Sequence, residues 1–294
     1  MVRQHYGREL WDRMCDFVQE PDGLLEYDFG AWTVRKLFFL AHYLGITTHA
    51  MSGHSKFSSL NYIDLFCGSG VFKVVSEGSR VRRYPGSALL AAGTQKTFDK
   101  IYLVDQDFEA LEAVTNRISR LGCTAELHTW CGDSNLLIDD VVAKIPDRAL
   151  NIAFIDPYSL KVHFNTISTL AKSRAMDLII LFADRMDIER NVEEYYYPRK
   201  SDNLDLFLGE DSDWRAEWEQ LENRDGGKIR QFFADCYLRQ LKAIGYYYSR
   251  TKVIESDRGP LYRLIYASKN EHGLKFWDIA ESEDVDRQRG LFGY

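Results

Sequence analysis

The sequence predicts an α/β fold with a seven-stranded, mostly parallel sheet that ends in an antiparallel hairpin. From residue 61 onward, short apolar runs alternate with segments of helical periodicity. Several of these runs are apolar at every position, which is typical of parallel strands covered on both faces. Two further apolar runs near the C-terminus are joined by a short Gly-Pro turn, which indicates a hairpin. With 294 residues, 45% of them hydrophobic, the chain can bury a large core.

Helical spacing appears first near the N-terminus. Apolar residues recur every three or four positions and predict a helix over 31–44, ending at Gly45. They are Val34, Leu37, Phe38, Ala41 and Leu44. A polar stretch over 52–59 follows, and then a buried strand over 61–66.

Four more strands are predicted over 101–104, 126–130, 152–155 and 176–182. Between the first two of these, Asp107 is predicted to cap the N-terminus of a helix and Gly122 its C-terminus. Because parallel strands end at one edge of a sheet, the residues that follow them are expected to lie together.

The alternation breaks at about 184–227, an acidic, aromatic-rich segment that we interpret as an insertion. A helix over 228–243 and strands over 246–254 and 261–268 follow. We therefore divide the chain into three parts: a helical segment over 1–56 that completes the binding site, a domain over 57–280 that contains the insertion, and a charged tail over 281–294.

Composition excludes several classes of protein. The net charge of −7 excludes a uniformly basic nucleic-acid coat, although it allows a local basic groove. Five cysteines without a C-x-x-C pair predict neither a disulfide scaffold nor a zinc finger, and no metal site is predicted. No signal peptide and no apolar run of about 20 residues is visible, so we expect a cytoplasmic protein without a membrane partner.

The first strand leads into a glycine motif, Asp64-Leu-Phe66-Cys-Gly68-Ser-Gly70. A strand followed by G-x-G lets the backbone approach a ligand where a Cβ would clash. Lys73 stands where a dinucleotide-binding motif has its third glycine, and G-K-[ST] is absent. The motif therefore predicts neither a dinucleotide site nor a P-loop.

Carboxylates follow the next three strands. Asp105 can bond both hydroxyls of a ribose, Asp133 the amine of an adenine, and Asp156 ends the fourth strand. Each of them alone also fits a loop cap. Together and in this order, they favour the site of an adenosine-type cofactor.

Asp156-Pro157-Tyr158 is the most informative triplet. Proline fixes its own φ and holds the preceding residue extended. This geometry can present a carboxylate and a backbone carbonyl as two acceptors for one NH₂ group, while Tyr158 stacks on a flat ring. The alternative is a simple turn with a surface tyrosine.

These residues resemble class I S-adenosylmethionine-dependent methyltransferases and, more closely, the bacterial three-Cys-motif partner protein family. The resemblance covers roughly residues 30–277. Its pieces are Trp32-Thr33-x-x-Lys36, Tyr43-Leu44, the glycine motif, Gly86-Ser87-Ala88-Leu89, Gly132-Asp133-x-Asn135, Phe154-Ile-Asp156-Pro157-Tyr158, Met176-Asp177-Leu178, Leu181-Phe182, Arg190-Asn191, Gly245-Tyr246, Leu261-Tyr262 and Ala267-Ser268-Lys269. The sequence departs from that family at Ser159, where glycine is usual. It also has one proline where nucleic-acid amino-methyltransferases usually have two.

The resemblance implies a Rossmann-like class I methyltransferase fold, S-adenosylmethionine as cofactor, and a separate partner protein with three cysteines. It implies these cofactor-binding residues: Thr33, Lys36, Asp64, Phe66, Gly68, Gly70, Asp105, Gly132 and Asp133. With Asp156, Pro157 and Tyr158 as catalytic residues, we expect methyl transfer to an amine of a nucleobase or nucleic acid.

Other interpretations stay open. A basic run contains Arg80, Arg82 and Arg83 and predicts binding of a nucleic acid or nucleotide substrate through its phosphates. The same run is also typical of a solvated loop. The chain as a whole also fits a small-molecule methyltransferase. A third alternative is a non-catalytic partner subunit that serves a three-cysteine-motif enzyme.

Overall fold

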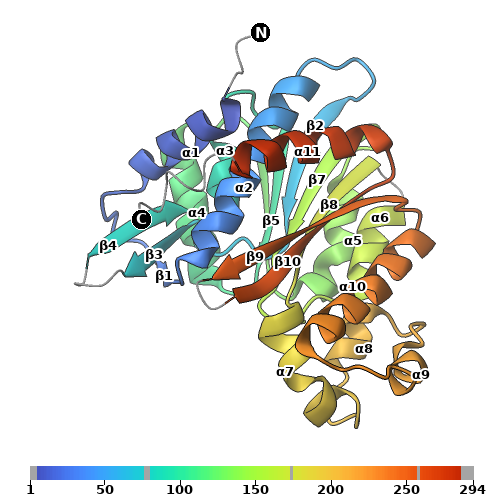
Figure 1. The fold of residues 1–294 in the computed structure, drawn as a ribbon. Helices are drawn as coiled ribbons and strands as arrows, with labels where there is room; N and C mark the ends of the chain where they lie inside the picture. Colours follow the sequence, from blue (N-terminus) through green and yellow to red (C-terminus); the bar gives the residue numbers. More distant parts are fainter. Residues whose placement is uncertain (1–4, 76–79, 173–174, 257–258, 286–294) are drawn as a thin grey trace.

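A seven-stranded sheet forms the centre of the computed structural model, which describes residues 5–75, 80–172, 175–256 and 259–285 (Figure 1). The strand order is β6-β5-β2-β7-β8-β10-β9. The strands are β2 (Ser59–Asp64), β5 (Lys100–Asp105), β6 (Glu126–Cys131), β7 (Ala149–Ile155), β8 (Ala175–Phe182), β9 (Tyr248–Ser256) and β10 (Gly259–Ser268). This architecture confirms the predicted fold class.

The C-terminal hairpin lies at one edge of this sheet. β10 pairs antiparallel with both β8 and β9, so β9 runs in the same direction as the five parallel strands. Residues 257–258 of the predicted turn lie outside the described residues. At the centre of the sheet, Asp64 of β2 stands opposite Leu103 of β5 and Phe154 of β7. The carboxyl ends of these three strands therefore meet at one place.

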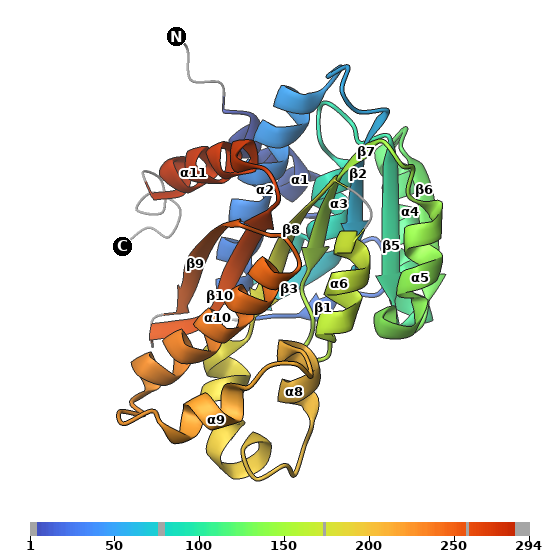
Figure 2. The same ribbon diagram turned by 90° about the vertical axis from the view of Figure 1, so that its right-hand side faces the viewer.

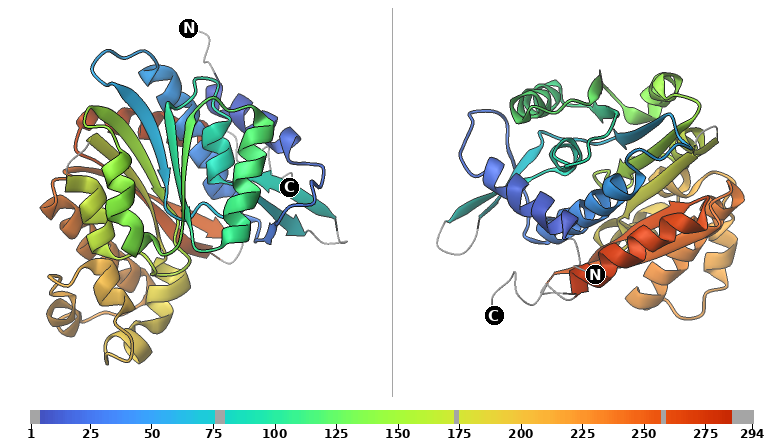
Figure 3. Two further views of the ribbon diagram at one scale, coloured as in Figure 1. Left: turned by 180° about the vertical axis from the view of Figure 1, so that it is seen from behind. Right: turned by 90° about the horizontal axis from the view of Figure 1, so that it is seen from above.

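Helices cover both faces of the sheet. On one face are α2 (Trp32–Met51) and α11 (Glu271–Val285), and on the other are α5 (Ser134–Lys144) and α6 (Phe164–Lys172) (Figures 1 and 3). The helix α4 (Phe108–Leu121) has the predicted caps, because Asp107 accepts bonds from two backbone N–H groups and Gly122 is left-handed. In the part of the chain that the structure describes, no helix is long and apolar enough to cross a bilayer.

The predicted end of the first long helix at Gly45 is wrong, because α2 continues to Met51. Gly45 is needed for close packing between helices. A Cβ at this position would lie 2.9 Å from the backbone of Tyr6 and Gly7, at the start of α1 (Tyr6–Phe17). A glycine that permits such an approach has the same sequence signal as one that ends a helix.

A second, small sheet combines a short strand that precedes β2 with two strands from the connection between β2 and β5. It contains β1 (Tyr27–Asp28), β3 (Val71–Val75) and β4 (Val81–Pro85) in the order β1-β3-β4, and the helix α3 (Ser87–Ala92) follows it. This sheet was not predicted from the sequence. It brings the N-terminal segment 18–30 beside the glycine motif.

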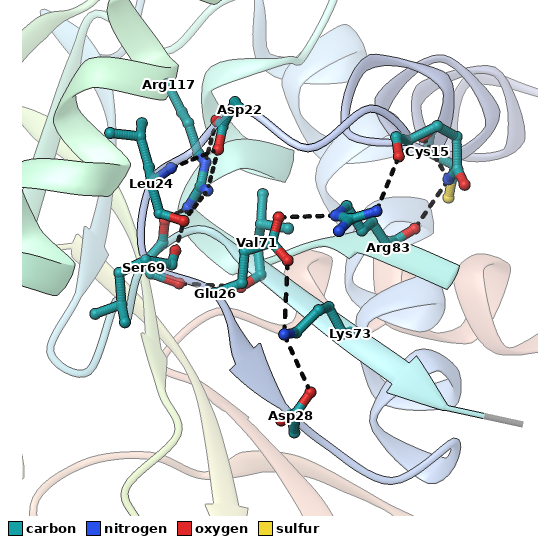
Figure 4. Close-up of polar contacts among 12 residues, drawn as sticks. Cys15, Asp22, Leu24, Glu26, Asp28, Ser69, Val71, Lys73, Arg83 and Arg117 are labelled. Atoms are coloured by element: carbon teal, nitrogen blue, oxygen red, sulfur yellow. Dashed lines mark hydrogen bonds and ion pairs between the residues drawn. The ribbon is translucent and has the colours of Figure 1, made fainter. Parts of the chain in front are cut away.

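Arg117 of α4 fastens this N-terminal segment to the glycine motif (Figure 4). Arg117 as a whole is 1% exposed, and its guanidinium group donates two hydrogen bonds, of 2.7 and 2.8 Å, to the carboxylate of Asp22. It also donates to the carbonyl oxygens of Ser69, at 2.7 Å, and Leu25, at 2.8 Å. The Arg117 hydrogen bond holds the pKa of Asp22 below its ordinary value. One buried cation thus joins α4, the segment before β1 and the glycine motif.

The segment after β8 folds into short helices at the end of the molecule nearest the carboxyl ends of the strands (Figure 2). They are the π-helix η1 (Asp184–Ile188), α7 (Glu189–Asn191), the π-helix η2 (Val192–Tyr196), α8 (Asn203–Leu208) and α9 (Trp214–Glu219). Trp214 and Trp218 are fully buried and pack against Phe233 of α10 (Gly226–Ala243). The two tryptophans therefore hold the segment 184–227 against the main domain.

Candidate active site

A cavity of about 720 Å³ lies at the carboxyl ends of β2, β5 and β7. Its volume is within the range of small-molecule and cofactor sites. Many of the predicted site residues line it: Thr33, Lys36, Phe66, Gly68, Gly70, Asp105, Asp156, Pro157 and Tyr158. The fold thus brings the start of α2, the glycine motif and the ends of β5 and β7 around one space.

Gly68 and Gly70 serve this space in different ways, although both have a positive φ, +57° and +82°. The nearest atom to a Cβ on Gly68 would be a ring carbon of Tyr27, 3.9 Å away, so the loop is open there. A Cβ on Gly70 would lie only 2.8 Å from Val114 of α4. Gly68 therefore leaves room at the cavity, whereas Gly70 permits close packing on the helix.

The carboxylate of Asp105 supports the glycine motif from the neighbouring strand. One oxygen accepts a hydrogen bond from the backbone N–H of Gly68, at 2.7 Å, and the other accepts from Asp107, at 3.0 Å. Each carboxylate oxygen can accept a second bond. Asp105 can therefore hold the motif in shape and still bind a ligand hydroxyl.

Asp156 forms an ion pair with Lys36, the fifth residue of α2, which is almost fully buried. The ammonium group also lies 5.6 Å from the ring centre of Tyr262 on β10, which lines the same cavity. The ion pair fixes one oxygen of Asp156 and leaves acceptor capacity on the other. No local pattern indicates that Lys36 and Asp156, 120 residues apart, would meet.

Tyr158 is 81% exposed, and the Lys161 ammonium lies 5.8 Å from its ring centre. It stands at the mouth of the cavity with two other exposed apolar side chains, Phe29 and Met186. A ring at this position can stack on a flat ligand that lies at the mouth of the cavity. Its stacking role stays a prediction.

Several predicted site residues do not line the cavity. Asp133 caps α5 and accepts a 2.8 Å bond from the backbone N–H of Asn135, while Gly132 lies beside it. Arg80 and Arg82 are exposed on or beside β4, and Arg83 pairs with Glu26 at 2.8 Å. The adenine role of Asp133 and the substrate grip of the arginines stay predictions.

Asp64 is fully buried beneath the glycine motif and also lies outside the lining of the cavity. Its carboxylate accepts bonds of 3.2 Å from the backbone N–H of Phe66 and from the hydroxyl of Tyr62. Burial raises the pKa of Asp64 to about 7. Asp64 therefore shapes the turn from below and does not face the ligand space.

This burial predicts a pH-dependent effect of Asp64→Asn on stability. In the folded chain Asp64 keeps its proton up to about pH 7, whereas in the unfolded chain it loses the proton near its ordinary pKa of 3.8. Its contribution to the free energy of unfolding therefore falls as the pH rises between these two values. Asn has no such dependence, so the variant should gain stability relative to the parent between pH 5 and pH 8. Urea unfolding at both pH values measures this difference, and an equal difference at both would contradict the buried, protonated state.

Some lining residues were not assigned to the site by sequence reasoning. They are Tyr27, Asp28 and Phe29 around β1, Leu181 and Ala183 at the end of β8, Met186 and Asp187 on η1, and Tyr262 on β10. A two-residue strand and a π-helix have no periodicity that a sequence can reveal. Leu181 and Tyr262 fall within pieces of the family resemblance, which was the available signal. Among the described residues, no group of three or more His, Cys, Asp or Glu side chains could hold a metal ion.

Comparison with known proteins gives similarity at the level of structure. No family model and no curated protein matches the sequence. The crystal structure of protein LPL1258 from Legionella pneumophila str. Philadelphia 1 is similar, with a TM-score of 0.52 at 11% identity, over 86% of this chain and 92% of that one. This similarity shows the α/β fold.

Two further solved structures are similar at lower scores. An O-methyltransferase from Bacillus cereus in complex with SAH has a TM-score of 0.44 at 9% identity, over 92% of this chain and 93% of that one. The O-methyltransferase TomG from Streptomyces achromogenes in complex with SAM has a TM-score of 0.45 at 9% identity, over 92% of this chain and 100% of that one.

Proposed function

We propose that this protein is an S-adenosylmethionine-dependent methyltransferase that acts on an amine. One observation carries the proposal. The Asp156-Pro157-Tyr158 triplet lines the same cavity as the open glycine Gly68 and the carboxylate of Asp105. A site for a nucleoside-containing cofactor and a pair of acceptors for an NH₂ group thus share one space.

The residues present fit the proposed cofactor. The loop at Gly68 is open where a side chain would intrude, and Asp105 retains acceptor capacity for ribose hydroxyls. Thr33, at the start of α2, adds a hydroxyl to the lining. When bound, S-adenosylmethionine supplies a methyl group that is already activated by its positively charged sulfur, so the protein's main task is to orient the acceptor.

The acceptor would be held by the end of β7. The free acceptor capacity of Asp156 and the carbonyl oxygen of Pro157 would take the two hydrogens of an NH₂ group, so that the nitrogen lone pair is free to point along the cavity. Lys36 keeps the Asp156 carboxylate in a fixed orientation, which is how a preorganised polar group contributes most. A strong base is not needed, because the proton can leave after the methyl group has been transferred.

A nucleobase is the acceptor that these features favour. Aromatic side chains at the mouth of a site stack on bases that are single-stranded or displaced from a helix, and Tyr158 and Phe29 stand at the mouth here. The net charge of −7 favours the alternative of a small-molecule acceptor. The three-Cys-motif resemblance supports the alternative of a partner subunit without catalysis of its own.

Binding of S-adenosylhomocysteine to an Asp105→Ala variant tests the cofactor site. We expect the affinity to fall by about 10- to 100-fold, because each charge-assisted hydrogen bond contributes about 1.5–3 kcal/mol. Isothermal titration calorimetry measures the change. If the variant bound as tightly as the parent, the assignment of Asp105 to the ribose would be wrong.

Asp133→Ser is a matched variant just after β6, the next strand of the sheet. Serine caps a helix nearly as well as aspartate, so the variant removes the charge and keeps the cap of α5. A loss of affinity in this variant would support the predicted contact between Asp133 and the adenine. An unchanged affinity would leave Asp133 as a helix cap.

A further inference from the structure

Ser159 has an unusual backbone conformation directly after the Asp156-Pro157-Tyr158 triplet. Its φ of +66° lies in the left-handed region, which a residue with a Cβ rarely adopts. Such strain persists where surrounding contacts hold it, and it is concentrated at functional sites. A contact of the Ser159 side chain holds this conformation.

That contact is Asp187 on the π-helix η1, 28 residues further along the chain. The hydroxyl of Ser159 donates a hydrogen bond to one carboxylate oxygen of Asp187. The other oxygen accepts bonds from the side-chain amide of Asn191, at 2.9 Å, and from the hydroxyl of Tyr196. Burial and the Asp187 charge raise the pKa of Tyr196, which keeps it a donor. Both oxygens of Asp187 thus accept hydrogen bonds from other side chains of the protein.

Asp187 is itself fixed in position by burial and by backbone hydrogen bonds. It is 7% exposed, and its backbone N–H and that of Ile188 both donate to the carbonyl oxygen of Ala183, at 3.1 and 3.2 Å. Asp184, at the start of the same π-helix, forms a buried ion pair of 2.8 Å with Arg263 of β10. The π-helix is therefore tied to the central sheet. Single π-turns of this kind are frequent at functional sites because the extra residue changes where side chains point.

We propose that Asp187 is a positioning residue, which holds Ser159 in its left-handed conformation and so fixes Asp156, Pro157 and Tyr158 against the cavity. This inference rests on the proposed function, since it gives the segment 184–227 a part in the same site. It also explains the departure at Ser159 from the glycine of the similar family. Here a hydrogen bond from Ser159 to Asp187 of the insertion stabilises a conformation that glycine adopts without such a bond.

The test combines two substitutions and measures amide hydrogen exchange in the segment 156–161, with S-adenosylhomocysteine present in excess. We expect Asp187→Ala to speed exchange in this segment by about 10-fold or more. Ser159→Gly alone should leave exchange close to that of the parent. In the double variant, exchange in 156–161 should return toward the parent value, because glycine no longer needs the hydrogen bond.

Tyr196→Phe is the matched control, since it removes another donor to Asp187 and leaves Ser159 untouched. It should change exchange within 192–197 and leave 156–161 as in the parent. If Asp187→Ala left 156–161 unchanged, or if glycine at 159 gave no rescue, Asp187 would serve only to fold the insertion. Titration of S-adenosylhomocysteine into the parent separates the two proposals: absence of binding refutes the proposed function, whereas binding without rescue refutes the role of Asp187.

Discussion

Asp156→Asn is expected to lower the rate of methyl transfer by about 10²-fold or more and to leave the affinity for S-adenosylhomocysteine unchanged. Asparagine has one acceptor oxygen, which Lys36 would occupy, and an amide N–H₂ that would then face the amine of the substrate. The loss corresponds to one preorganised electrostatic contact, about 2.7–4 kcal/mol. The cofactor contacts on β2 and β5 are not altered.

At position 156, asparagine tests the catalytic role more specifically than alanine does. Lys36 is almost fully buried, and Asp156→Ala would leave its ammonium group without this partner. Removing one member of such a pair costs about 3–5 kcal/mol of stability. Alanine would therefore combine a loss of stability with any loss of catalysis.

The rate is measured as transfer of a labelled methyl group to total RNA, single-stranded DNA and free nucleosides, assayed in parallel. Asp28→Asn is the control, because Asp28 is an exposed carboxylate that lines the same cavity. We expect it to retain most of the activity. If Asp156→Asn kept the parent rate, Asp156 would not contact the acceptor. An equal loss of stability and cofactor binding would make it a turn-former, and no transfer by the parent to any of these acceptors would contradict a nucleobase substrate.

Arg117→Met should lower the free energy of unfolding by about 3–5 kcal/mol, because it removes one member of a buried ion pair. Methionine keeps the length and the apolar stem of the side chain. It removes the hydrogen bonds that Arg117 donates to the carboxylate of Asp22 and to the carbonyl oxygens of Leu25 and Ser69. The affected backbone includes the glycine motif, so cofactor affinity should fall as well.

Arg120→Met provides a control on the same helix and against the same partner. Arg120 lies 3.5 Å from Asp22 with a side chain that is 52% exposed, and an exposed pair of this kind contributes about 1 kcal/mol or less. Denaturant unfolding of both variants gives the comparison. If the two variants lost similar amounts of free energy of unfolding, the burial of Arg117 would contribute little to stability.

The sequence predicted those parts of the fold that depend on local patterns. Apolar runs marked β5, β7 and β8, and Asp107 and Gly122 marked the ends of α4, because caps and buried strands are properties of a few neighbouring residues. The predicted helix end at Gly45 was wrong because the glycine permits close contact with another helix, which a local pattern cannot reveal. The small sheet was missed because β1 has two residues and β3 follows a glycine motif that usually leads into a helix.

The residues of the candidate site also fall into those that the sequence predicted and those that it did not. Asp105 and Asp156 were found because strand ends share one edge of a parallel sheet. Tyr262 and Asp187 were not assigned, since only the folded chain brings β10 and η1 to that edge. Asp133 shows a different limit of pattern reasoning, because a helix cap and a cofactor ligand require the same carboxylate.

Hydrogen exchange of the unaltered protein, with and without S-adenosylhomocysteine, tests the central claim most directly. The account predicts slower exchange over 66–70 and 105–107, where the glycine motif and Asp105 line the cavity. It predicts no change over 51–60, which lines a separate polar hollow of about 330 Å³. Unchanged exchange throughout, or slower exchange confined to 51–60, would contradict it.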